Sequence, residues 1–302
     1  MLTNQQINIL AAVGFVIMWS SGFIGARLGT AEAGSLTVLM WRFIVAAAIL
    51  SVWWLWKQRK RMSITIVLWQ SFIGLLAQGG YLLGVFLSVE NGVSAGTSNL
   101  ITTLQPIVVA ALAGPVLKQN TTIKEWIGLL IGILGVLLVV YDDLGTSAHV
   151  PIWAYALSVM AMVSLVTSTL LEKKFDFSAP LSDALPIQTI ISALLFTVIA
   201  LVSNQAAPPV SYDFWVAVLW VAVLSSIGGY GFYWLNLTLG SVTRVSSLLY
   251  LTPPVTMIWA FLMFGETIGF FTIMGMLLCF IGVWIISQKE MRQWKAKRCI
   301  EM

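Results

Sequence analysis

The sequence predicts an all-α integral membrane protein with ten transmembrane helices, arranged as two inverted repeats of five helices. Composition is the first reason: of 302 residues, 59% are hydrophobic and 9% are charged, whereas a soluble domain has about a quarter of its residues charged. The second reason is a series of apolar runs, each near the roughly 20 residues that a helix needs to cross a bilayer. The third is a pattern of residues in the first half that recurs in the second half.

Ten apolar segments follow one another along the chain. In order they are residues 7–27, 36–56, 65–89, 94–117, 123–141, 151–171, 182–203, 213–237, 243–264 and 267–287. The first segment has no basic stretch before it and nine further spans after it. It is therefore predicted to be a retained helix and not a cleaved signal peptide.

Positive charges mark alternate ends of these segments. With the N-terminus placed in the cytoplasm, 14 of the 16 Lys and Arg residues fall inside: Lys57, Arg59, Lys60, Arg61, Lys118, Lys124, Lys173, Lys174, Arg244, Lys289, Arg292, Lys295, Lys297 and Arg298. The opposite ends carry Glu32, Asp142, Asp143 and Asp213. Because cytoplasmic loops are enriched in Lys and Arg, both termini are predicted to be cytoplasmic.

An internal repeat explains the order of the helices. Gly79-Gly80-Tyr81 recurs as Gly228-Gly229-Tyr230, at an offset of 149 positions. Two longer blocks, 92–109 and 127–140, resemble 240–257 and 274–287 at offsets of 148 and 147. The chain therefore divides into repeats at 1–145 and 146–302. Since five spans is an odd number, the second repeat must cross the membrane in the opposite sense to the first, as the repeats of many secondary transporters do.

Several motifs give the chain a family resemblance. They are "WSSGFIGARLG" (19–29), "MWRFIVAAAIL" (40–50), "TSNLITTLQPIVVAALA" (97–113), "SSLLYLTPPVTMIWAFLMFGE" (246–266) and "IGLLIGILGVLLVV" (127–140). Together with the ten spans, they resemble EamA-type members of the drug/metabolite transporter superfamily. The resemblance implies ten helices around a central cavity, and export of amino acids or other small metabolites across a bacterial inner membrane. The Gly265-Glu266 pair that closes the ninth span has no equivalent near Pro115 to Lys118 in the first repeat, so the resemblance implies no symmetric role for Glu266.

Arg42 is the most informative charged residue. It lies about six residues into the second span, roughly 9 Å below the membrane surface at 1.5 Å per residue. One interpretation is that it binds a substrate carboxylate with two parallel hydrogen bonds. The alternative is an ion pair with Glu90 or Glu266, or a side chain extended to the interface. Either glutamate could also couple transport to protons, while facilitated diffusion and exchange stay open.

Other polar and aromatic residues at membrane depth complete the candidate site. The predicted substrate-binding residues are Trp19, Arg42, Gln78, Tyr81, Asn99, Gln105, Tyr230, Trp234 and Tyr250. Pro106, Pro253 and Pro254 are predicted to kink the fourth and ninth spans and to free backbone carbonyls there. The serine and threonine hydroxyls of these two spans could also line the cavity. We favour the alternative that they repair the kinks or pack helices together. For Asn99, Gln105 and Tyr250 the two interpretations are balanced.

The same inventory argues against other classes of function. An enzyme would need paired carboxylates, a Ser/His couple or a metal cluster at depth, yet the one histidine, His149, is in a predicted loop. Cys279 and Cys299 are not expected to meet, and no metal, cofactor or catalytic residue is predicted. The expected partners are a small-molecule metabolite and the lipid bilayer, and the basic tail needs no nucleic acid to explain it. A lipid translocase or a structural membrane protein is the alternative.

Overall fold

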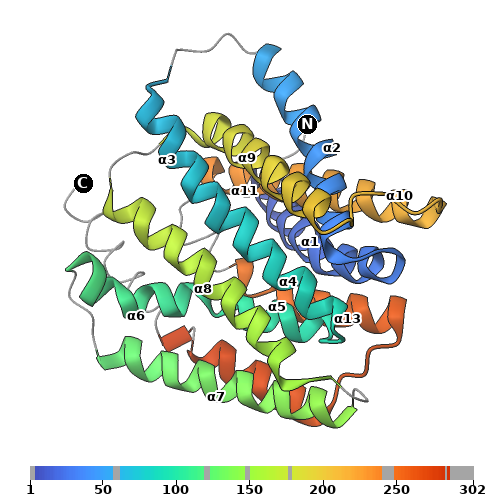
Figure 1. Ribbon diagram of the computed structural model, residues 1–302. Coiled ribbons are helices and arrows are strands. Elements are labelled where there is room, and N and C mark those ends of the chain that lie inside the picture. The colour runs from blue at the N-terminus through green and yellow to red at the C-terminus, as the bar shows by residue number, and fades with distance from the viewer. Residues whose placement is uncertain are drawn as a thin grey trace.

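The computed structural model describes residues 4–56, 62–118, 123–146, 150–175, 179–239, 248–282 and 284–285. All regular structure in these ranges is helical, with no strand among them (Figure 1). Eight helical segments there are long and apolar enough to span a bilayer, and two shorter apolar helices are Thr252–Phe264 and Phe270–Gly282. The predicted fold class is thus confirmed.

The first five spans are built from eight helical segments. They are α1 (Asn4–Glu32), α2 (Ser35–Trp56), α3 (Ile64–Gly74), η1 (Leu75–Gly80), α4 (Tyr81–Glu90), α5 (Ala95–Thr103), α6 (Gln105–Leu117) and α7 (Ile123–Thr146). The third span combines α3, η1 and α4, and the fourth combines α5 and α6.

The last five spans follow the same plan. They are α8 (Ile152–Lys174), α9 (Leu181–Val202), the eighth span formed by α10 (Tyr212–Leu219), η2 (Trp220–Gly229) and α11 (Tyr230–Leu239), then α13 (Thr252–Phe264) and the helix Phe270–Gly282. The start of the predicted ninth span, the end of the predicted tenth, His149, Cys299 and most of the basic tail lie outside the described residues.

Both repeats widen into a π-helix at the same place. The segments η1 and η2 end at Gly79-Gly80 and Gly228-Gly229, and an α-helix resumes at Tyr81 and Tyr230. Such wide turns are uncommon and are frequent at functional sites. The recurring tripeptide therefore marks a shared irregularity in the third and eighth spans.

Small residues let the third span approach α8 closely. A Cβ atom added at Gly84 would lie 2.6 Å from the backbone oxygen of Leu157, and one at Gly80 would overlap the Ser164 hydroxyl. Backbone approach of this kind is the usual role of glycine between membrane helices. Gly80 of the first tripeptide and Gly84 one turn later thus serve close packing on α8.

The principal contacts between helices recur when the two repeats are exchanged. Helix α1 packs on η2 and α11, and its equivalent α8 packs on η1 and α4. The pairs α2–α9 and α5–α13 are each formed by equivalent spans, and α1–α13 matches the packing of α8 on α5 and α6. A two-fold relation between the halves requires this pattern. The division of the chain at residues 145 and 146 stays a prediction.

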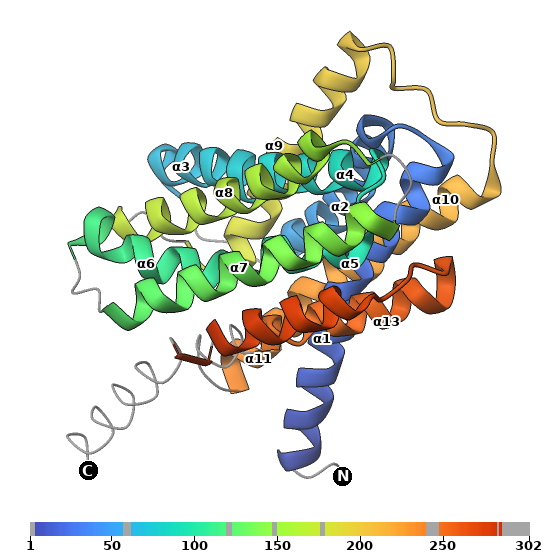
Figure 2. The ribbon, with the colours of Figure 1, turned by 90° about the horizontal axis from the view of Figure 1, so that it is seen from below.

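The fifth and last spans lie side by side at one edge of the molecule (Figures 1 and 2). Gly135 of α7 faces Gly275 so closely that a Cβ atom at Gly135 would lie 2.5 Å from the Gly275 carbonyl oxygen. The other side of α7 exposes apolar side chains, including Leu130, Leu134 and Leu137. A lipid-facing surface has this character, because an apolar side chain there meets hydrocarbon and not water.

Candidate functional site

A small cavity lies between the two repeats, in the middle of the main apolar core. Its walls come from α1, α2, α4, η2 and α11, and are formed by Trp19, Gly22, Phe23, Arg42, Tyr81, Leu82, Val85, Ser225 and Tyr230. Four of the nine predicted substrate-binding residues therefore meet here: Trp19, Arg42, Tyr81 and Tyr230. Two residues equivalent in the repeats, Tyr81 and Tyr230, line the same space.

Arg42 is the only formal charge among the described residues that line this cavity. Its side chain is 3% exposed, and its Nε and Nη2 atoms donate hydrogen bonds to the hydroxyls of Ser226 (3.2 Å) and Ser225 (3.3 Å). The guanidinium carbon lies 5.7 Å from the ring centroids of both Phe43 and Phe86. The Nη1 atom has no hydrogen-bond partner within the described structure. A buried cation with unused donors is costly unless something else binds there.

Ser225 and Ser226 owe their position to the π-helix. Ser226 accepts the bond from Arg42 and donates to the backbone oxygen of Val221 at 3.2 Å, five residues earlier, which is the spacing of a π turn. Sequence reasoning did not select these two serines. The signal that could have found them is a pair of adjacent hydroxyls in an apolar span, two residues before the repeated Gly-Gly-Tyr motif.

Aromatic rings form the wall on the side of α1. Trp19 packs edge-on against Tyr230 with ring centroids 5.8 Å apart, and Phe15 lies 5.5 Å from Trp19 and 6.2 Å from Tyr233. Trp234 lies in α11, but its side chain is outside the described part of the structure. The wall offers flat apolar faces with hydroxyl tips, which suits the apolar part of a small solute.

Glu90 and Glu266 lie at the C-terminal ends of the third and ninth spans. Each accepts hydrogen bonds from the first residue of another helix. Glu90 accepts hydrogen bonds from the backbone N–H and the hydroxyl of Ser35, at 3.2 and 2.5 Å. Glu266 accepts from the backbone N–H of Ala95 at 3.2 Å. Both carboxylates thus meet a helix N-terminus, where a negative charge is favourable. The observed hydrogen bonds of Arg42 go to serine hydroxyls and not to either glutamate.

The pKa of Glu266 lies above its ordinary value of 4.5. Burial of this loop residue is the main cause, and Asp143 adds to it. The backbone N–H groups of Ala95 and Gly96 and the charge of Arg27 act in the opposite direction. A raised pKa means that the folded protein binds a proton more tightly than the unfolded chain does.

Glu266→Gln is expected to flatten the pH dependence of thermal stability. The favourable contribution of the protonated side chain is complete below pH 4.5 and is lost as the pH rises through the higher folded-state pKa. Wild-type protein should therefore lose stability relative to the glutamine variant over that interval, while glutamine keeps an acceptor for Ala95. Melting temperatures of both proteins from pH 4 to 8 measure this. Parallel curves would contradict it.

Asn99 connects the fourth and ninth spans. It is buried, and its Nδ2 atom donates to the hydroxyl of Thr256 at 2.6 Å. Its Oδ1 atom accepts from Thr103 at 3.0 Å and from Thr252 at 3.3 Å. The structure therefore places Asn99 in a protein network at the contact between the repeats, and not among the residues that line the Arg42 cavity.

Two glutamines also join helices. Gln78 donates to Gln188 of α9 at 3.5 Å and accepts from Thr189 at 3.4 Å. Gln105 donates to Thr169 of α8 at 3.1 Å. Hydrogen bonds between membrane helices are each worth about 1 kcal/mol, so these residues contribute to the assembly of the two halves.

The prolines lie just after interruptions of the helix in the fourth and ninth spans. The fourth span breaks at Leu104, two residues before Pro106, and the Thr102 hydroxyl bonds to the backbone oxygens of Ser98 and Asn99 just before the break. Pro253 and Pro254 occupy the first turn of α13, where a missing N–H is tolerated.

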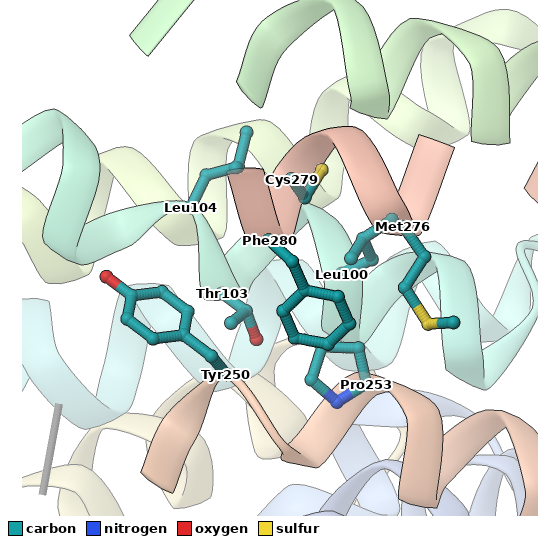
Figure 3. A pocket seen from close by; sticks show the side chains of 8 residues that line it. All are labelled: Leu100, Thr103, Leu104, Tyr250, Pro253, Met276, Cys279 and Phe280. Atoms are coloured by element: carbon teal, nitrogen blue, oxygen red, sulfur yellow. The ribbon is translucent and has the colours of Figure 1, made fainter. Parts of the chain in front are cut away.

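Tyr250 and Pro253 line a second small pocket, shown in Figure 3. They face Leu100, Thr103 and Leu104 of the fourth span and Met276, Cys279 and Phe280 of the last helix. The pocket has almost no polar surface and contains no charged residue. It offers less to recognise a polar metabolite than the cavity at Arg42 does.

The sequence matches the EamA-like transporter family twice, over residues 6–141 and 152–288. The two matches correspond to the two five-span halves whose helix packing is similar in the structure. Among solved structures, a crystal structure aligns with a TM-score of 0.65 and 14% identity, covering 95% of this chain and 98% of that one. That likeness shows the fold alone.

Relatives from three organisms align over most of the chain. A protein named an uncharacterized transporter in Archaeoglobus fulgidus is 26% identical, with 95% of this chain and 99% of the relative covered. Proteins named probable amino-acid metabolite efflux pumps are 24% identical in both Salmonella typhimurium (89% and 91% covered) and Escherichia coli (93% and 95% covered).

Proposed function

This chain belongs to the EamA-like transporter family, and we propose that it is a secondary active transporter that exports amino acids or related small metabolites by alternating access. It is a multi-pass membrane protein, and its family and relatives point to transport and not to catalysis. The cavity at Arg42 carries the proposal. It lies between the repeats and combines an aromatic wall with a buried cation that has unused hydrogen-bond donors.

The corresponding packing of the two halves supports alternating access. Because the principal packing pairs of the two halves correspond, the halves could exchange conformations at similar energy, and this would expose a site at their interface to one side and then to the other. Trp19, Arg42, Tyr81 and Tyr230 are the proposed substrate-binding residues. Asn99, Gln78 and Gln105 are proposed to hold the helices that surround the site.

The proposed location is a bacterial inner membrane with both termini in the cytoplasm. In the described part of the chain, Lys118, Lys124, Lys173 and Lys174 all lie at helix ends on the proposed cytoplasmic side. The acidic pair Asp142-Asp143 lies at the opposite end of α7. This distribution supports the orientation, since positive charge favours the cytoplasmic face.

Counterflow into liposomes tests the proposed function. Purified protein should exchange at least one member of a panel of amino acids and organic acids in a saturable manner. Trp19→Ala should weaken apparent affinity by about tenfold, equivalent to about 1.4 kcal/mol, because it removes an aromatic wall of the cavity. The matched control is Trp153→Ala, a tryptophan on α8 that is 56% exposed, which should transport normally. If no compound on the panel shows saturable exchange, the proposed function fails.

A further inference from the structure

The described lining of the cavity at Arg42 carries a positive charge and no negative charge. Its described lining contains one guanidinium, the hydroxyls of Tyr81, Tyr230 and Ser225, and otherwise apolar or aromatic groups, with no carboxylate among them. The acidic residues that are partly or fully buried at the outer ends of the spans have other partners. Glu266 accepts from Ala95, and Asp143 accepts from the Tyr155 hydroxyl at 2.8 Å.

Arg42 retains the donors that an anion would use. The Nη1 atom is buried and unpartnered in the described structure, while Nε and Nη2 are held by Ser226 and Ser225. These two bonds and the rings of Phe43 and Phe86 fix the plane of the guanidinium. A carboxylate entering from the cavity would therefore meet a pre-oriented donor group and would neutralise a charge that no carboxylate of the described lining compensates.

Among the described lining residues, a positively charged ammonium group has no equivalent partner. In an amino acid this group is held on the carbon next to the carboxylate, so binding of the carboxylate would bring it within a few ångströms of the Arg42 cation. Like charges repel at that distance in a site of low polarity. Only hydroxyls and aromatic rings are available in the described lining to offset the repulsion and the loss of hydration.

We propose that the cavity selects organic acids that have an apolar or aromatic body and a carboxylate but no ammonium group. Deaminated or N-acylated relatives of the apolar amino acids belong to this class. The inference rests on the proposed transport function and narrows the substrates of the same site from amino acids and related metabolites to the related acids that lack an ammonium group. Arg42 binds the carboxylate, and Trp19, Phe23 and Tyr230 enclose the apolar body.

Three compounds share a phenyl body and differ in their charged groups. 3-Phenylpropanoate carries a carboxylate, phenethylamine carries an ammonium group, and phenylalanine carries both. Binding to the purified protein in detergent at pH 7.5 is measured by titration calorimetry, which membrane permeation of a weak acid does not disturb. Expected is an affinity for 3-phenylpropanoate at least about tenfold above that for phenylalanine, with phenethylamine weakest, since each tenfold step is about 1.4 kcal/mol. Competition against counterflow in liposomes should give the same order.

Two substitutions assign the preference to Arg42. Arg42→Gln should lower affinity for 3-phenylpropanoate by about tenfold or more and leave phenethylamine binding no weaker. Ser225→Asp keeps Arg42 and supplies it with an internal carboxylate, so it should weaken binding of the acid in the same way even if the first variant folds poorly. The two variants together distinguish loss of the charge from loss of the fold.

Each contrary result has a distinct meaning. Equal or tighter binding of phenylalanine or phenethylamine than of 3-phenylpropanoate overturns the inference and leaves the proposed transport function intact. The same holds if 3-phenylpropanoate does not bind while other compounds of the panel show saturable counterflow. If nothing on the panel is exchanged, both the proposed function and the inference fail.

Discussion

Arg42→Met is expected to make the protein more stable and inactive in transport. The guanidinium is buried, has no carboxylate among its observed hydrogen-bond partners and leaves Nη1 without a partner in the described structure. Replacing buried ionic groups by apolar side chains of similar volume stabilises proteins by up to about 1–4 kcal/mol. Methionine follows the same path as the arginine stem, and its flexible side chain can fill the space beside Phe43 and Phe86.

The same change removes the only formal charge in the described part of the cavity lining. Transport of carboxylates should fall by at least about a hundredfold, which corresponds to about 2.7 kcal/mol of lost interaction. Thermal unfolding in detergent and counterflow in liposomes measure the two effects on one preparation. Arg27→Met is the control, because Arg27 is exposed at the end of α1 and should change neither quantity strongly. A less stable Arg42→Met variant would indicate that Arg42 has a structural role.

Gly135→Leu is expected to destroy the packing of the last helix against α7. A Cβ atom at this position would lie 2.5 Å from the Gly275 carbonyl oxygen and 2.7 Å from the Cys279 sulfur. The nearest atom is backbone, so one helix must move away from the other. Overpacking typically costs about 1–3 kcal/mol and more where the backbone must shift, and we expect a loss of at least about 3 kcal/mol or no folded protein.

Gly145→Leu is the matched control for this prediction. Gly145 is on the same helix, is exposed, and has no atom within 4 Å of the position where a Cβ would be. Leucine there should be neutral or slightly stabilising, because it is a better helix former than glycine by about 0.8 kcal/mol. The yield of monodisperse protein and its melting temperature compare the two variants. Equal behaviour would show that α7 and the last helix can separate at little cost.

The order and number of the spans could be read from the sequence because they depend on local properties. Apolar runs, the basic residues at their ends and the repeated blocks are each visible in a single stretch of chain. The repeat also located Tyr81 and Tyr230, which the structure brings to one cavity. The position of Arg42 within the second span was equally evident, since it requires only a count of residues.

The partners of the polar residues could not be read in the same way. The sequence left Arg42 between a substrate and the two glutamates. The structure pairs it with Ser226, which is 184 positions away, and ties the glutamates to Ser35 and Ala95. Asn99, Gln78 and Gln105 were candidates for the cavity but connect helices in the structure. An amide has the same local pattern in both roles.

The sequence by itself thus determined a membrane protein of two inverted five-helix halves, because the bilayer requires long apolar helices and an odd number of spans inverts the second half. Only the tertiary structure decided which side chains meet. The paired π turns place Ser225 and Ser226 against Arg42 and set Tyr230 opposite Trp19. Those contacts depend on the relative rotation and distance of helices far apart in the chain, and close packing between glycine-lined surfaces determines both.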